Sequence, residues 1–271
     1  MTQDYISMFK DDFLKHTRIA ITYRTDKPVM DEPIFIEGLS GLGNVGMIAA
    51  SHLIRSIGAK KLADVYSPYF IRPGIPIPGI MYTDGVAELP KDEIYYDLEQ
   101  NLIIILGFYQ GSTPNSYFRL ANSILDFCDD FGVKQIFTLG GYGTGQYHEA
   151  PAVHGVATTH ELVERLKKYD VLVESGQKGP ITGISGLLLG VGKERGFEGI
   201  CLLGETYGEF PDPKSAKAVL TTLCRIIGVD VDTGELDKEI ELLEDEIQKR
   251  AMIIKDQMEE KARSDDLSYI C

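Results

Sequence analysis

The stretch Ile34–Ile54, IFIEGLSGLGNVGMIAASHLI, carries the clearest structural pattern in this chain. It begins with an apolar run that is typical of a strand, and from Val45 onward apolar side chains recur at helical spacing. Between the two runs stands the pattern G-x-G-x-x-G, formed by Gly41, Gly43 and Gly46. The stretch therefore predicts a strand, a tight glycine turn and a helix, which is the unit from which α/β sheets are built.

Strand and helix patterns alternate along the rest of the chain. The predicted strands are Arg18–Tyr23, Pro33–Glu37, Lys61–Tyr66, a hairpin around Leu89–Asp92 with Glu93–Tyr96 as its second strand, Leu102–Leu106, Gln135–Leu139, Val171–Val173 and Gly199–Leu203. The predicted helices are Val45–Ile57, with Asn44 as its cap and Gly58 at its end, Ser116–Phe131, Thr159–Tyr169 and Asp212–Ile227. This order predicts an α/β fold with a mostly parallel sheet and helices on both faces, in one domain over residues 1–233.

The composition excludes several classes of function. The chain has 271 residues, a formal net charge of -14 and a pI of about 4.8. Such an acidic surface repels nucleic acid and anionic membranes. No segment approaches the roughly 18 to 20 apolar residues of a membrane helix, and the N-terminus does not resemble a signal peptide, so a cytoplasmic protein is expected. The cysteines form no metal-binding or disulfide spacing; they are Cys128, Cys201, Cys224 and Cys271.

The glycine turn has a functional and a structural interpretation. A dinucleotide fingerprint would place a pyrophosphate at the helix start near Asn44, but it also needs an acidic residue at the end of the next strand. Asp64 stands at the start of its strand instead. The glycines are therefore expected to serve tight turning and close packing, and no cofactor is expected. A second run, Gly140–Gly145, predicts another turn. The candidate anion contacts are Gly41, Gly43, Asn44, Gly46, Gly141 and Gly143.

Motifs for catalysis are incomplete. His148-Glu149 is followed by His154, six residues after the first histidine, whereas a zinc-protease helix needs a spacing of four. Gly183-Ile-Ser185-Gly-Leu187 lacks the second glycine of a nucleophile elbow, and no histidine follows Ser185. Neither catalytic residues nor a metal site are expected.

Residues 234–266 predict a long charged helix. Along this helix the apolar residues form a stripe with an eleven-residue period. Such a period keeps the apolar residues on one face of the helix. Its members are Leu236, Ile240, Leu243, Ile247, Ala251, Ile254 and Met258. Such a helix could pack along its own domain, but its length and its acidic remaining faces favour packing against copies of itself.

Taken together, several segments resemble the proteasome assembly chaperone 2 family, particularly its archaeal members. They are EGLSGLGNVGMIAASHLI (37–54), NLIIILGFYQG (101–111), YFRLANSILDFCDDFGVKQIFTLGGYGTG (117–145) and the region from GPITGISG (179–186) through ETYGEFPDP (205–213). The resemblance implies a three-layer α/β/α sandwich similar to nucleoside phosphorylases, without their catalytic groups. It also implies a homo-oligomer that binds proteasome α subunits or α rings and transforms no substrate.

The resemblance also bears on residues 267–271. Some archaeal relatives are similar in ending with a hydrophobic residue, tyrosine and any residue, and this ending docks between α subunits. Here the end reads Leu267, Ser268, Tyr269, Ile270, Cys271, so the tyrosine stands one position earlier. Leu267, Tyr269, Ile270 and Cys271 are the candidate partner contacts, and a frayed, unengaged end is the alternative.

A second class of function stays open. Because fold does not determine function, an enzyme with a phosphorylase-like fold could act on a nucleotide or a phosphorylated small molecule. It would use Asn44, the run Gly140–Gly145 and Glu205.

Overall fold

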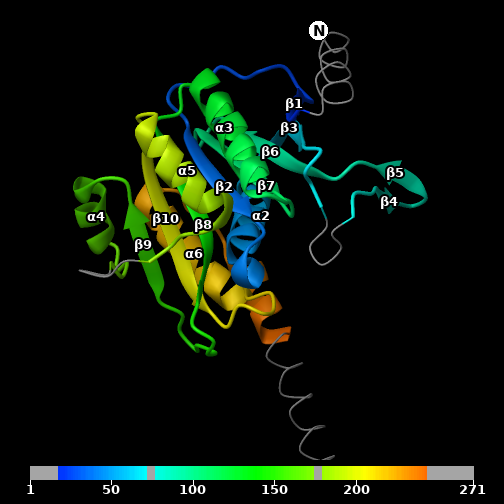
Figure 1. Ribbon diagram of the computed structural model, residues 1–271. Coiled ribbons are helices and arrows are strands. Elements are labelled where there is room, and N and C mark those ends of the chain that lie inside the picture. Colours follow the sequence, from blue (N-terminus) through cyan, green and yellow to red (C-terminus); the bar gives the residue numbers. More distant parts are fainter. Residues whose placement is uncertain (1–17, 72–76, 174–178, 243–271) are drawn as a thin grey trace, which may run out of the picture. The chain divides into compact units, whose positions relative to one another are not determined.

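The computed structural model describes residues 18–71, 77–173 and 179–242 (Figure 1). The chain divides into two compact units, residues 1–231 and 232–271. Every described strand belongs to the first unit. In the second unit, residues 234–242 are helical, and the remainder of the predicted 234–266 helix lies outside the described residues.

The described strands and helices follow the predicted alternation. The strands are β1 (Ala20–Tyr23), β2 (Ile34–Leu39), β3 (Lys60–Tyr66), β4 (Met81–Thr83), β5 (Val86–Glu88), β6 (Lys91–Asp97), β7 (Leu102–Gly107), β8 (Gln135–Gly143), β9 (Val153–Ala157) and β10 (Glu198–Thr206). The helices are the 3₁₀ turn η2 (Leu42–Asn44), α2 (Val45–Ile57), α3 (Pro114–Asp130), α4 (His160–Lys167), α5 (Gly183–Glu194) and α6 (Pro213–Ile227).

Eight strands form one mixed sheet in the order β1-β3-β6-β7-β2-β8-β10-β9. The four strands β7, β2, β8 and β10 are mutually parallel, as predicted for the centre of the sheet. The flanking strands pair antiparallel, so that β1, β6 and β9 run opposite to the other five. The parallel centre brings the carboxyl ends of its four strands to one edge.

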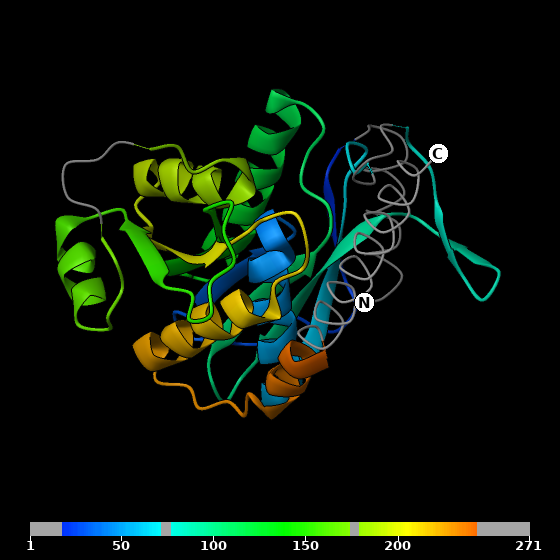
Figure 2. The same cartoon turned by 90° about the horizontal axis from the view of Figure 1, so that it is seen from below.

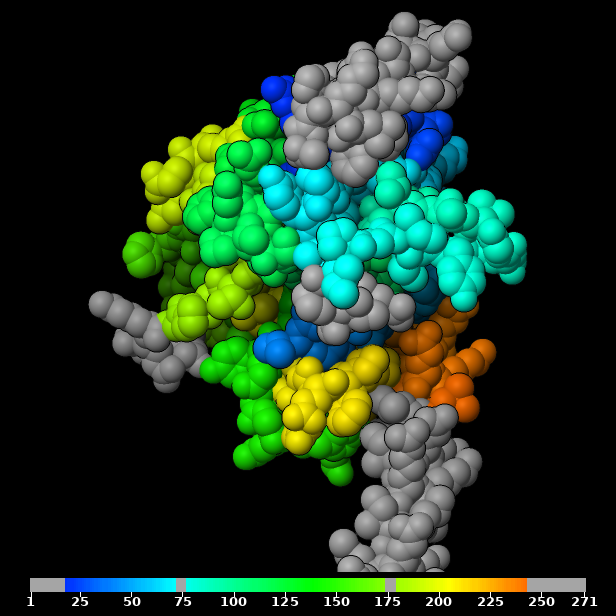
Figure 3. All heavy atoms as spheres, turned by 45° about the vertical axis from the view of Figure 1, so that its right-hand side comes forward, coloured from blue at the N-terminus to red at the C-terminus, as the bar shows by residue number. Residues whose placement is uncertain are grey.

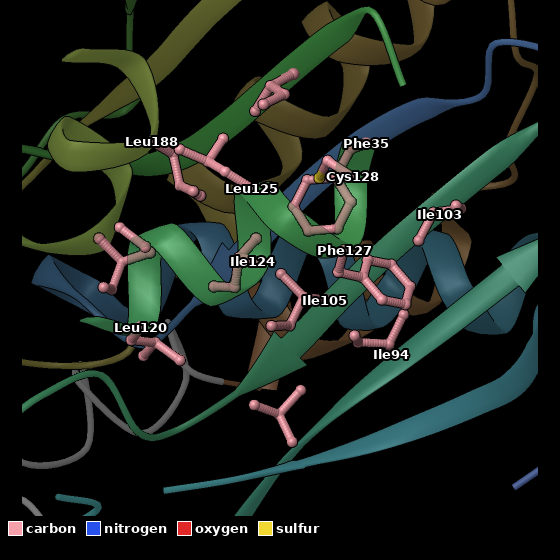
Figure 4. Packing of buried hydrophobic residues seen from close by; sticks show 14 of the residues in the cluster. Phe35, Ile94, Ile103, Ile105, Leu120, Ile124, Leu125, Phe127, Cys128 and Leu188 are labelled. Carbon is pink, nitrogen blue, oxygen red and sulfur yellow. The ribbon is translucent and has the colours of Figure 1, made fainter. Parts of the chain in front are cut away.

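Helices cover both faces of the sheet. In Figures 1 and 2, α3 and α5 lie side by side on one face, and α2 and α6 lie on the other. A cluster of buried apolar side chains lies under α3. Leu120, Ile124 and Phe127 of α3 point toward Ile103 and Ile105 of β7 (Figure 4). Burial of such side chains contributes roughly 1.5–3 kcal/mol each and fixes the helix against the sheet.

Three local predictions need correction. β6 does not pair with a strand before Leu89; it lies in the main sheet between β3 and β7, and the hairpin is formed by β4 and β5 instead. The run Gly140–Gly143 continues β8 and pairs with β10. Val171–Val173 is not a strand, because only Leu172 forms an isolated bridge, with His154. Strand β9 and helix α5 were not predicted, since their apolar residues are interrupted by glycine and histidine.

None of the described helices has the length and apolar character that a membrane-spanning segment requires. The cysteines in the described ranges, Cys128, Cys201 and Cys224, are buried and reduced.

Candidate functional site

A cleft of about 910 Å³ opens at the carboxyl edge of the parallel strands. It is lined by the segment that follows β2, the carboxyl-terminal half of β8, the first turns of α3 and α5, and the segment before α5. Open α/β sheets bind ligands at this edge. Its lining residues are Ser40, Gly41, Leu42, Gln110, Pro114, Tyr117, Phe118, Leu139, Gly140, Gly141, Tyr142, Gly143, Pro180, Ile181, Thr182, Gly183, Ser185, Gly186, Leu187 and Leu203.

One polar side chain ties the two sides of the cleft together. Gln110 donates from Nε2 to the carbonyl of Ser40, at the end of β2, and its Oε1 accepts from the Ile184 N–H at 3.0 Å. The Gln110 side chain thus satisfies one of the free N–H groups in the first turn of α5, where Thr182 provides no side-chain cap.

A buried carboxyl group lies beneath the cleft. The Ser185 hydroxyl, which lines the cleft, donates to Oε2 of Glu37 at 2.8 Å, and the Leu39 N–H donates to Oε1 at 3.0 Å. Glu37 is completely buried in β2. Desolvation outweighs these two hydrogen bonds and raises the pKa of Glu37 to about 7. Glu37 and Ser185 are 148 residues apart in the sequence, and sequence analysis did not pair them.

The first glycine motif serves packing. A Cβ at Gly46 would stand 2.1 Å from the carbonyl oxygen of Leu139, so α2 can approach β8 only because position 46 is glycine. Gly43 has a φ of 60°, and its N–H donates to the carbonyl of Gly208 at 3.2 Å. The Asn44 N–H donates to the carbonyl of Gly41 at 3.0 Å. Two N–H groups that a pyrophosphate would need are therefore bonded within the protein.

Asn44 does not cap α2 as predicted. It occupies the N-cap position with a φ of 49°, but its side chain makes no cap hydrogen bond and instead accepts from the Ser40 hydroxyl at 2.9 Å. Asp212 also lies beside the glycine turn: its N–H donates to the Gly43 carbonyl at 2.8 Å, and its carboxylate accepts from the Thr206 hydroxyl at 2.8 Å. An anion bound here would face that carboxylate.

The second glycine run is a packing feature as well. Gly141 and Gly143 belong to β8 and not to a turn. A Cβ at Gly141 would stand 2.4 Å from the carbonyl oxygen of Leu42. Only after Gly143 does the chain turn, with a φ of 65° at Gly145. Gly141 lets the loop after β2 cross close to β8.

The structure brings Glu205 together with His148 and His154, which the sequence analysis considered only as an incomplete zinc motif. Nε2 of His154 lies 3.2 Å from Oε1 of Glu205, and Nδ1 of His148 lies 3.5 Å from Oε2. The Ala152 N–H donates to the same carboxylate at 3.1 Å and is the main cause of a lowered pKa of Glu205. Nε2 of His148 in turn lies 2.8 Å from the Thr144 hydroxyl. This cluster holds the β8–β9 connection against β10.

The chemistry available in the cleft is limited. Within the described ranges, no Asp, Glu, His, Lys or Arg lines it. The Glu37 carboxyl can take up or release a proton near neutral pH, but the described lining of the cleft has no cationic side chain to stabilise a developing negative charge. No group of three or more His, Cys, Asp or Glu in the described part of the chain is arranged to hold a metal. The lining of the cleft is largely apolar and aromatic with a few polar groups, a composition that is typical of ligand-binding pockets.

The predicted self-association and partner residues are only partly described. Leu236 is buried within the chain, and Ile240 is half-buried. The remaining predicted positions, Leu243, Ile247, Ala251, Ile254, Met258, Leu267, Tyr269, Ile270 and Cys271, lie outside the described residues.

Comparison with known proteins places this arrangement in a family. The model of the PAC2 family matches residues 35–251, which include the whole sheet from β2 onward and its helices. This chain belongs to the PAC2 family. An uncharacterized protein of Methanocaldococcus jannaschii is 32% identical over 246 residues, covering 89% of this chain and 93% of that protein.

Solved structures of PAC2-like proteins have the same fold. The crystal structure of Pyrococcus furiosus PbaB, described as an archaeal proteasome activator, is 38% identical with a TM-score of 0.79, over 87% of this chain and 99% of that one. Pyrococcus furiosus PbaA, described as an archaeal homolog of proteasome-assembly chaperone, is 27% identical with a TM-score of 0.69, over 86% and 96% of the two chains. The resemblance expected from the sequence segments is confirmed at the level of the family.

Proposed function

We propose that this PAC2 protein is a non-catalytic, proteasome assembly chaperone-like protein that binds proteasome α subunits or α rings as a homo-oligomer in the cytoplasm. The observation that carries the proposal is the similarity to PbaB, which extends over 99% of that chain at 38% identity. The similarity to PbaA points to the same partner. The cleft supports a binding role, because its described lining offers no charged side chain for catalysis.

The end of the chain is the proposed contact with the ring. Tyr269 would supply an aromatic anchor, and the Cys271 carboxylate would pair with a lysine or arginine of the α subunits. Several tails on one oligomer would engage several pockets, so that weak single contacts add through effective concentration.

Binding to purified α subunits and to assembled α rings tests the proposal. The full chain should bind at least one of them. Removing residues 267–271 should weaken ring binding at least tenfold while leaving the melting temperature and the oligomer mass unchanged. Tyr269→Ala should reproduce most of that loss, and Ser268→Ala is the matched control with little expected effect. Unchanged binding after truncation would place recognition on the globular unit, and no binding by the intact chain would refute the proposal.

One observation keeps an enzyme as the second candidate: a hydroxyl–carboxyl pair, Ser185 and Glu37, lies at an open cleft of about 910 Å³. Such an enzyme would act on a nucleotide or a phosphorylated small molecule. Calorimetry with NAD, NADP, FAD and ATP should show no affinity tighter than roughly millimolar, about -4 kcal/mol, since the N–H groups of Gly43 and Asn44 are already bonded. A micromolar affinity would favour the enzyme.

A further inference from the structure

The hairpin of β4 and β5 is regular but uncovered. Asp84 and Gly85 both have positive φ, 50° and 80°, as a two-residue type I′ turn requires. The two strands pair only with each other, and all six of their residues are exposed. Figures 1, 2 and 3 show the hairpin standing away from the main sheet. A two-stranded hairpin alone is marginally stable in water. Contact with a further strand or another protein surface would therefore stabilise this hairpin.

Apolar side chains are concentrated on this hairpin. Tyr82 is 75% exposed and lies opposite Ala87, so the two share one face. On the other face, Val86 is 63% exposed and lies opposite Thr83. Ile80 and Leu89, which flank the strands, are exposed as well. An exposed apolar group of this kind on a projecting element marks a contact with another protein.

The backbone geometry identifies which groups are free. In a two-residue hairpin the pair next to the turn, Thr83 and Val86, is the hydrogen-bonded pair, and the next pair, Tyr82 and Ala87, is not. The N–H and C=O of Tyr82 therefore point outward along the free edge of β4. Within the described residues no backbone hydrogen bond reaches that edge.

The two edges of the hairpin are not equivalent. β5 ends in Glu88, whose carboxylate lies 3.4 Å from Nζ of Lys91, and charges on an edge strand discourage further pairing. β4 reads Met81-Tyr82-Thr83 and carries no charge, and no proline interrupts it. β4 is the edge open to strand addition.

We propose that β4 pairs edge to edge with β4 of a second copy of this chain, antiparallel about a two-fold axis at Tyr82. Antiparallel pairing of a strand with its own copy places residue 82 opposite itself, and the two outward-facing N–H and C=O pairs then satisfy each other. Met81 of each copy lies opposite Thr83 of the other, so no like charges meet although the chain carries a net charge of -14. The result is a four-stranded sheet with Tyr82 and Ala87 of both copies on one face.

A second copy accounts for this edge better than an unrelated strand. Register is fixed by symmetry, and the tyrosines form a cross-strand aromatic pair at the centre. The strands are short, so the hairpin acts as one contact within a larger self-association and needs no proteasome subunit to form.

Disulfide trapping tests the pairing directly. Opposed residues of a hydrogen-bonded antiparallel pair have Cα atoms about 5.5 Å apart, within the reach of a disulfide. In a full chain carrying Cys271→Ser, Tyr82→Cys should give a covalent dimer on mild oxidation. Ala87→Cys, on the opposite edge of the same hairpin, is the matched control and should remain monomeric on a denaturing gel.

A non-covalent readout accompanies the trap. Tyr82→Lys places two like charges at the two-fold axis and should weaken self-association at least tenfold by sedimentation, while Tyr207→Lys, an exposed aromatic residue elsewhere, should not. The proposal is supported if Tyr82→Cys forms the covalent dimer and Ala87→Cys does not, and if Tyr82→Lys weakens self-association. No trapping at 82, equal trapping at 87, or unchanged self-association in Tyr82→Lys overturns it. These measurements contain no proteasome, so they stand or fall separately from the proposed function.

Discussion

Glu37 shows how one buried side chain can make the stability of the whole chain depend on pH. It lies in the central strand β2, has no exposed surface and contacts a hydroxyl and a backbone N–H instead of a cation. Neutral contacts cannot offset the loss of water around a charge, so the protonated form is favoured in the folded chain. Asp92, also fully buried, has a raised pKa for the same main reason, and the charge of Glu37 raises it further.

Glu37→Gln should alter the pH dependence of stability. The pKa of Glu37 in the folded chain, about 7, lies above the ordinary glutamate value of 4.5, so between these values the unfolded chain releases a proton that the folded chain retains. The free energy of unfolding of the native chain should therefore fall as pH rises from about 4.5 to about 7, by about 3 kcal/mol from this group.

The measurement is urea unfolding at pH 5 and pH 7.5. The difference in stability between Glu37→Gln and the native chain should shift in favour of the variant at the higher pH, because glutamine resembles the protonated acid and does not titrate. Ser185→Ala removes a hydroxyl that donates to Glu37, so it should raise the pKa of Glu37 further and extend the decline to higher pH. Parallel pH profiles for the native chain and Glu37→Gln would contradict this account.

At the scale of the element, α2 depends on a glycine whose role the motif alone does not reveal. Gly46→Ala would drive a methyl group to 2.1 Å from the Leu139 carbonyl, and neither α2 nor β8 can yield without breaking packing with its neighbours. The variant should lose about 3 kcal/mol of stability, at the upper end of ordinary overpacking. Gly41→Ala is the control within the same motif, since nothing lies within 4 Å of its added Cβ. Thermal or urea unfolding should show a large loss of stability for Gly46→Ala and little change for Gly41→Ala.

Most elements could be predicted from the sequence because local signals agreed with tertiary context. Val45–Ile57 was predicted with its bounds and its Gly58 end, and Pro213 opens α6 as expected. The antiparallel flanks could not be predicted, since nothing in the apolar pattern of Glu93–Tyr96 distinguishes a hairpin partner from a strand between β3 and β7. Similarly, the glycines of Gly183–Glu194 suppress helix propensity, and packing overrides it.

The candidate site was less accessible to sequence reasoning. Glu37 lies in a strand-like run, and the motif around Ser185 was considered alone. Their contact joins β2 to α5, which was not a predicted helix, so no spacing rule could reveal it. The contact of His148 and His154 with Glu205 was not predicted for the same reason, because β9, which carries His154, was missing from the predicted elements.

At the scale of the molecule, self-association is the property that most needs measurement. If the helix predicted for residues 234–266 contributes, Ile247→Asp with Ile254→Asp should lower the oligomer mass by placing charges in the apolar stripe. Gln248→Asp adds a charge next to the stripe and should change nothing. Light scattering on the three full chains decides this. A native chain that is monomeric would exclude both this helix and the β4 edge from self-association.

The position of β2 at the middle of the sheet has a consequence for how the chain folds during synthesis. β2 is among the first strands to be made, yet its neighbours β7 and β8 begin at Leu102 and Gln135. Closing such long loops is slow, and pairing cannot be completed until the second neighbour has left the ribosome. Until then β2 keeps an unpaired apolar edge, so nascent chains that stall before β8 should be sensitive to protease and prone to capture by general chaperones. A protein proposed to assist the assembly of others thus has a late-closing core of its own.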